Sequence, residues 1–123
     1  KGTIFNACIA PDDSYLIGCV TERDSSNLKR VTYMLFFHNP DDTWSKGIDL
    51  INALILPCPN AISVSVSFDG KYLFFASTKR NIRFKDILPD WRLSSITKRR
   101  LVSGNGNSDI YWMPIEDGFK KLR

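Results

Sequence analysis

Basic side chains are concentrated in residues 79–100, which hold eight lysines and arginines and only two acidic residues. This segment has a net charge of +6, whereas the whole chain has a net charge of +4. Clustered cationic groups attract anions, and a neighbouring aromatic ring offers a flat stacking surface. We predict a partner with an acidic protein surface and consider nucleic acid a less suitable partner. However, charge runs of this kind are more often only solvated. The predicted contact residues are Lys79, Arg80, Arg83, Trp91, Arg92, Lys98, Arg99 and Arg100.

Oxygen-bearing side chains alternate along residues 105–109, as they do in calcium-binding loops. In a calcium site the ligands would be Asn105, Asn107 and Asp109. However, Ile110 occupies the position at which such loops require glycine. We therefore favour turn formation, with Asp109 hydrogen-bonded to backbone or to a neighbouring unit, and we expect no metal and no cofactor.

Residues that could perform catalysis are few. The only histidine, His38, lies in a turn-forming stretch, and the chain has no Gly-X-Ser-X-Gly nucleophile motif. Three cysteines at irregular spacing show no metal-binding or redox pattern. We therefore expect no catalytic residue and mainly buried cysteines. Cys8 and Cys19 could still pair across neighbouring strands, which sequence alone cannot test.

Short apolar runs separated by turn residues indicate that these side chains are carried by an all-β fold. In the first half the expected strands lie before the turn at 11–14, from Tyr15 onward, at 31–37 and near Trp44. In the second half they lie at 63–67, 72–76, 109–113 and near Phe119, and residues 84–101 could hold one or two short helices. Most aromatic side chains of the second half should be core, and Trp112, beside Pro114, is the candidate for exposure.

The two halves of the chain are similar to each other at an offset of 57 residues. Residues 10–20, APDDSYLIGCV, align with residues 67–77, SFDGKYLFFAS, and a further aromatic strand follows each copy. The identities are Asp12 with Asp69, Tyr15 with Tyr72, and Leu16 with Leu73. We interpret this as two four-stranded antiparallel units, the second enlarged by a basic insertion at 79–103. Such units, repeated every ~40 to 50 residues, are typical of β-propeller blades.

The motifs SFDGKYLFFAS and GNSDIYWMPI resemble the repeats of TolB-like, WD-repeat-like β-propellers. Those repeats typically have a Ser-Pro-Asp-Gly-Lys turn before an apolar strand and Asp-Ile-Tyr or Asp-Leu-Tyr in the next strand. The sequence departs from this pattern at Asp13, where glycine is usual, and at Phe68, where proline is usual. The resemblance implies a propeller that serves as a platform for protein contacts in the bacterial periplasm or cell envelope. It carries over no ligand and no catalytic residue.

We therefore expect residues 1–123 to form one β-propeller-like unit, with blade one at about 4–50 and blade two at about 60–123. Propellers normally close with ~4 to 8 blades, so two blades should belong to a longer chain or to a homo-oligomer, unless they pack as a small sandwich. The predicted function is a non-enzymatic protein-binding or scaffold module. The alternatives are the propeller portion of an envelope hydrolase, a peptidase or carbohydrate-active enzyme with catalytic residues elsewhere, and a purely structural oligomer. With no run of ~18 apolar residues, we expect no transmembrane segment.

Overall fold

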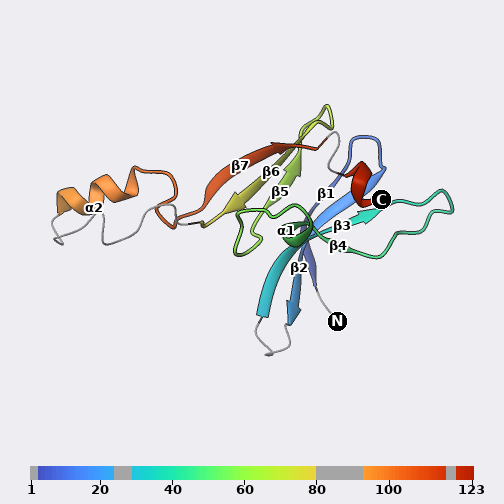
Figure 1. Ribbon diagram of the computed structural model, residues 1–123, viewed down its shortest axis with the longest axis horizontal. Helices are drawn as coiled ribbons and strands as arrows, with labels where there is room; N and C mark the ends of the chain where they lie inside the picture. The colour runs from blue at the N-terminus through green and yellow to red at the C-terminus, as the bar shows by residue number, and fades with distance from the viewer. Residues whose placement is uncertain (1–2, 24–28, 80–92, 116–118) are drawn as a thin grey trace.

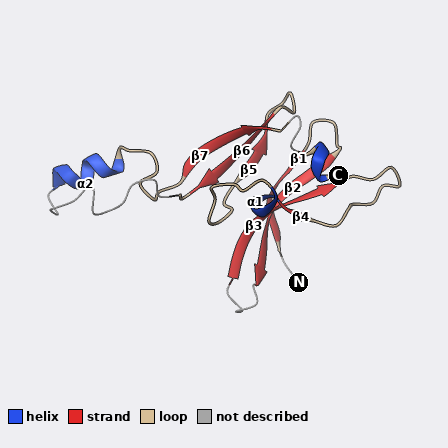
Figure 2. Ribbon diagram, viewed as in Figure 1, coloured by secondary structure: helices blue, strands red, loops and turns tan. Residues whose placement is uncertain are grey.

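The protein has an all-β fold with two antiparallel sheets, as Figures 1 and 2 show. The computed structural model describes residues 3–23, 29–79, 93–115 and 119–123. Sheet 1 contains β1 (Ile4–Ile9), β2 (Tyr15–Arg23), β3 (Lys29–Phe37) and β4 (Ile48–Asp49). Sheet 2 contains β5 (Val64–Val66), β6 (Tyr72–Ser77) and β7 (Asp109–Pro114). In each sheet the strands lie side by side in chain order, and the expectation of an all-β fold is confirmed.

Helices are short and few in the described part of the chain. They are α1 (Leu50–Ala53), α2 (Leu93–Arg100) and one 3₁₀ turn at Lys120–Leu122. Within the described ranges, no helix is both long and apolar enough to cross a membrane. Of the insertion at 79–103, which was expected to be partly helical, the structure shows the helix α2. Residues 80–92 of the insertion lie outside the described residues.

Two of the expected strands differ from the structure. Trp44 forms only a single bridge with His38, and the fourth strand of sheet 1 begins later, at Ile48. Sheet 2 has three strands in the described ranges, because the strand expected near Phe119 is replaced by a 3₁₀ turn. The buried ring of Phe119 packs edge-on against Tyr15, with ring centroids 5.2 Å apart. The end of the chain therefore covers sheet 1 instead of extending sheet 2.

The two sheets share one hydrophobic core. We call the contributing face of sheet 1 its inner face, formed by Tyr15, Ile17, Cys19, Tyr33, Leu35 and Phe37. The inner face of sheet 2 is formed by Val64, Leu73 and Phe75. Removing this apolar surface from water favours folding by roughly 25 cal/mol per Å². The rings of Tyr33 and Phe75, with centroids 6.3 Å apart, join the two inner faces.

The turns at residues 10–15 and 67–72 have the same backbone hydrogen bonds, at distances of 2.9 to 3.0 Å. These bonds run from Ala10 N–H to Tyr15 O and from Asp13 N–H to Ala10 O, and from Ser67 N–H to Tyr72 O and from Gly70 N–H to Ser67 O. Asp13 has a φ of 57° and Gly70 a φ of 71°, so both adopt the left-handed conformation. Aspartate tolerates this conformation better than most residues, so Asp13 can stand where the family pattern has glycine.

Each of these turns is also closed by an aspartate. The carboxylate of Asp12 accepts a hydrogen bond from the Ser14 hydroxyl at 2.6 Å, and that of Asp69 accepts one from the Ser67 hydroxyl at 2.5 Å. These hydrogen bonds favour the ionised form and lower the pKa of both carboxyl groups below its ordinary value. Asp12 and Asp69 thus stabilise the two turns in the same way.

Phe68 occupies the place in the second turn that Pro11 occupies in the first. Its side chain is 97% exposed, so its removal costs little packing. Proline suits the second position of such turns and restricts the unfolded chain, so Phe68→Pro should raise the free energy of unfolding by about 0.4 to 1 kcal/mol. Urea denaturation, with Phe68→Ala as the control for loss of the ring, measures this change. A destabilised proline variant would show that the two turns differ at this position.

Candidate functional site

The face of sheet 2 that points away from the core is apolar. Side chains alternate between the two faces of a strand, so this outer face is set by the register of β6 with β7. Its members on β6 and β7 are Tyr72, Phe74, Ala76, Ile110, Trp112 and Pro114, and Ser65 of β5 lies beside Phe74 on the same face. Ile110 is 80% exposed and Trp112 63% exposed, and the Trp112 ring packs edge-on against Tyr72 at 5.4 Å. Contiguous exposed apolar side chains of this kind mark contact surfaces.

Sheet 1 also has an apolar outer face, on the side opposite its inner face. Its apolar members are Ile4, Ile9, Leu16, Gly18, Val20, Met34 and Phe36, and its polar members are Glu22, Arg30, Thr32 and Asp49. Ile4 is 50% exposed and Ile9 53% exposed. A Cβ added at Gly18 would lie 2.7 Å from the side chain of Ile4, so the glycine allows Ile4 to lie across the sheet. Both sheets therefore have apolar side chains on both faces. The outer face of sheet 1 is partly covered, since Val20 and Thr32 are buried, whereas Ile4 and Ile9 stay exposed.

The prediction for the aromatic residues of sheet 2 is confirmed in part. Phe75 is buried in the core and Trp112 is exposed, as expected. The expectation that most of these aromatic side chains are core is wrong, because Tyr72 is exposed and Phe74 and Tyr111 are only half-buried. Ile110, the most exposed member of the outer face, was not anticipated. Residues 109–114 read DIYWMP, which is apolar at almost every position. This run predicts a strand but does not indicate which of its faces is covered.

Of the basic segment, the structure describes Lys79 and helix α2. Lys79 follows β6, and α2 carries Lys98, Arg99 and Arg100, while Arg80, Arg83, Trp91 and Arg92 lie outside the described residues. In Figure 1, α2 stands apart from both sheets, beyond the end of sheet 2. The side chains of Leu93, Lys98 and Arg100 are exposed. The structure thus presents α2 as a cationic arm and does not combine it with another described element into a closed site.

The loop proposed as a calcium site uses its polar groups to form turns. Asp109 accepts a hydrogen bond from the Gly104 amide at 2.6 Å, and the Asn105 side chain accepts one from the Asn107 amide at 2.7 Å. Gly104 and Gly106 have φ values of 72° and 95°. This is the backbone role expected of Asp109. Within the described residues, no three His, Cys, Asp or Glu side chains are placed to hold a metal ion.

His38 is part of a local turn structure. Its Nε2 atom lies 2.9 Å from Asp42 Oδ1, and its ring stacks on Trp44 with centroids 4.7 Å apart. These contacts hold the β3–β4 connection in place. They give the imidazole a neighbouring carboxylate, and within the described part of the chain its ring nitrogens form no hydrogen bond with a hydroxyl group.

The three cysteines are free thiols. Cys8 lies opposite Ile17 and Cys19 lies opposite Phe5, so the register does not bring Cys8 and Cys19 together. Burial raises the pKa of Cys19 to about 11 and also raises the pKa of Cys58. Both thiols stay protonated near neutral pH and act as small apolar groups in the core.

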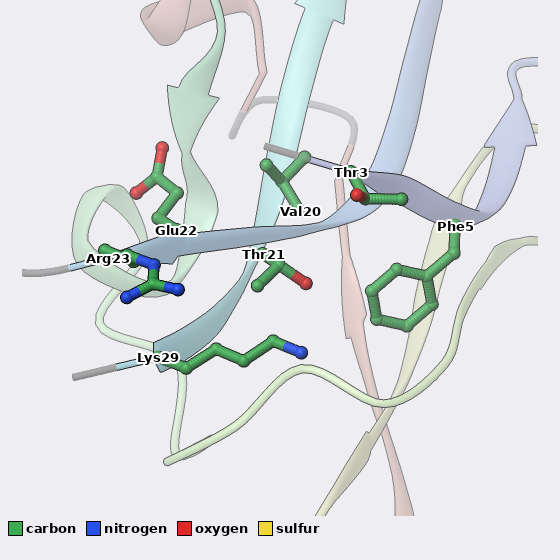
Figure 3. A pocket seen from close by; sticks show the side chains of 7 residues that line it. All are labelled: Thr3, Phe5, Val20, Thr21, Glu22, Arg23 and Lys29. Atoms are coloured by element: carbon green, nitrogen blue, oxygen red, sulfur yellow. The ribbon is translucent and has the colours of Figure 1, made fainter. Parts of the chain in front are cut away.

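An open hollow of about 1060 Å³ lies at the end of the β2–β3 hairpin, and Figure 3 shows its lining. The lining residues are Thr3, Phe5, Val20, Thr21, Glu22, Arg23 and Lys29. Arg23 and Lys29 come from paired positions of the two strands and both are exposed. The charged residues of its lining have both signs, since Glu22 lies there with Arg23 and Lys29, and none of the three is buried.

No family model, curated protein or solved structure matches this chain. The most distinctive features of the described residues are the exposed apolar outer face of sheet 2, the partly exposed outer face of sheet 1 and the cationic helix α2.

Proposed function

We propose that this chain is a non-enzymatic protein-binding or scaffold module, formed by two blade-like units of a TolB-like β-propeller. The observation that supports this proposal best is the exposed apolar outer face of sheet 2, together with the partly exposed outer face of sheet 1. Sheets that stack on neighbours need apolar side chains on both faces, whereas a sheet that faces water on one side alternates polar and apolar residues. Both outer faces are thus suited to protein contact. The location that accompanies this proposal is the periplasm or cell envelope.

The outer face of sheet 2 carries the residue types that contribute most to protein association. Tryptophan and tyrosine are enriched among the residues whose loss weakens complexes most, because they bury large areas with few rotatable bonds. Trp112 and Tyr72 contact each other on this face, and Ile110 extends it. Among the described side chains of α2, Lys98 and Arg100 are exposed cations that would steer a partner with an acidic surface and fix its orientation.

A photo-cross-linking experiment tests the proposal. Trp112 is replaced with p-benzoylphenylalanine in cells that produce the protein, and the matched control carries the same group at Ile55, which is 88% exposed and lies outside both outer faces. We expect protein adducts at position 112 that are several times more abundant than those at position 55. We also expect Ile110→Glu to reduce them. Equal labelling at both positions would contradict a binding role for this face.

A further inference from the structure

The core of the protein joins two faces that are not equivalent in the sequence alignment of the two halves. The offset of 57 residues aligns Tyr15, Ile17 and Cys19 of β2 with Tyr72, Phe74 and Ala76 of β6. The first three residues lie on the inner face of sheet 1, whereas the second three lie on the outer face of sheet 2. The sheets therefore pack front to back instead of front to front.

The third strand of each sheet follows the same relation. Tyr15 pairs with Phe37 and Tyr72 pairs with Pro114, so strand pairing extends the alignment from β3 to β7. The inner-face residues Tyr33, Leu35 and Phe37 then correspond to the outer-face residues Ile110, Trp112 and Pro114. Every one of the six inner-face positions of sheet 1 has an apolar counterpart on the outer face of sheet 2.

The converse relation holds for the other two faces. Leu16, Gly18 and Val20 lie on the outer face of sheet 1, and their counterparts Leu73, Phe75 and Ser77 are buried on the inner side of sheet 2. The exposed outer face of sheet 2 and the partly exposed outer face of sheet 1 thus correspond to the two faces that already bind each other in the core. A front-to-back contact of this kind can be repeated, because it leaves one free face of each kind at its ends.

We propose that the outer face of sheet 2 binds the outer face of sheet 1 in a second copy of this chain, and so repeats the core interface between molecules. This inference rests on the proposed function and names the partner of the same surface. The contact is head-to-tail, so it generates a ring if the rotation closes and an open assembly if it does not.

The core contact predicts one detail of the intermolecular contact. Tyr33 lies over Phe75 in the core, and their counterparts are Ile110 and Gly18. Gly18 has no side chain where Phe75 has a ring, but the methyl group of Ile4 lies over that position. Ile110 of one copy should therefore contact Ile4 of the next.

Two variants that each block one face test this proposal. Trp112→Glu places a charge on the outer face of sheet 2, and Ile9→Glu places one on the outer face of sheet 1. Both side chains are more than half exposed, so both variants should fold, as circular dichroism will show. Ile110→Glu repeats the first block at an independent position. Ile55→Glu adds the same charge outside both faces and should associate as the unmodified chain does.

We expect each blocked variant alone to have the monomer mass of 14.0 kDa in light scattering. An equimolar mixture should form a one-to-one dimer, because each variant retains the face that the other lacks. A mixture that stays monomeric would overturn the proposal, as would a blocked variant that still associates. If the mixture stays monomeric while position 112 cross-links to a different protein, the binding function stands and the second copy is not the partner. If the mixture stays monomeric and position 112 gives no more protein adducts than position 55, both proposals fail.

Discussion

Replacing Tyr33 with phenylalanine should lower the free energy of unfolding by about 1 to 2 kcal/mol. The Tyr33 side chain is fully buried, and its hydroxyl lies 2.9 Å from the carbonyl oxygens of both Ser63 and Ala76. The Ile62 amide donates to the same hydroxyl at 3.3 Å. A single phenol thus links β3 to the backbone just before β5 and to the backbone of β6. Its loss removes the hydroxyl's hydrogen bonds between the two sheets and leaves the ring in place.

Tyr33→Ala should have a much larger effect, because removal of a buried ring leaves a cavity that costs about 3 to 5 kcal/mol. This is a large fraction of the ~5 to 15 kcal/mol by which domains are normally stable. The matched control is Tyr15→Phe, since Tyr15 is also buried on the inner face of sheet 1. No hydrogen bond of its hydroxyl is seen within the described residues, so we expect less than about 0.5 kcal/mol. Urea denaturation measures all three variants, and equal effects of Tyr33→Phe and Tyr15→Phe would contradict the bridging role.

Replacing Asp49 with alanine should lower the free energy of unfolding by about 2 to 4 kcal/mol. The carboxylate accepts hydrogen bonds from the Thr32 hydroxyl at 2.6 Å and from Arg30 at 3.1 Å. It also caps α1, where it accepts from the Ile51 amide at 2.9 Å and from the Asn52 backbone and side chain at 3.3 and 2.7 Å. One side chain therefore joins β3, β4 and α1.

The largest share of this effect should come from Thr32, whose hydroxyl is fully buried and would lose its acceptor. Loss of the helix cap adds about 1 kcal/mol, and the partly exposed Arg30 ion pair adds little. Asp49→Asn keeps one acceptor oxygen and should cost less than Asp49→Ala. In a Thr32→Val background the cost of Asp49→Ala should fall by at least about 1 kcal/mol, which a double-mutant cycle measures. An unchanged cost would show that Thr32 is not what Asp49 stabilises.

The strands of both sheets could be predicted because their signals are local. Apolar runs and turn residues indicate β1 to β3 and β5 to β7, and the paired turns at Asp12 and Asp69 follow from side-chain chemistry within a few residues. Two features could not be predicted in this way: the position of β4, and the 3₁₀ turn that stands where a strand was expected near Phe119. Both depend on contacts with sheet 1 that are distant in the sequence.

The candidate site could be predicted less well for the same reason. The exposure of Ile110 depends on which face of β7 meets the core, and its strand is apolar on both faces. The role of Asp49 depends on Thr32, which is 17 residues away and is brought close by the pairing of β3 with β4. Positive charge in the basic segment is visible in the sequence, but the separation of α2 from both sheets is a property of the folded chain (Figure 1).

The mass of the unmodified chain in solution, measured by light scattering over a range of concentrations, tests most directly whether the outer faces bind a second copy. We expect a mass above 14.0 kDa that rises with concentration, and a return to 14.0 kDa when Trp112 is replaced with glutamate. A mass that remains at 14.0 kDa at every concentration for both chains would contradict front-to-back association through these faces.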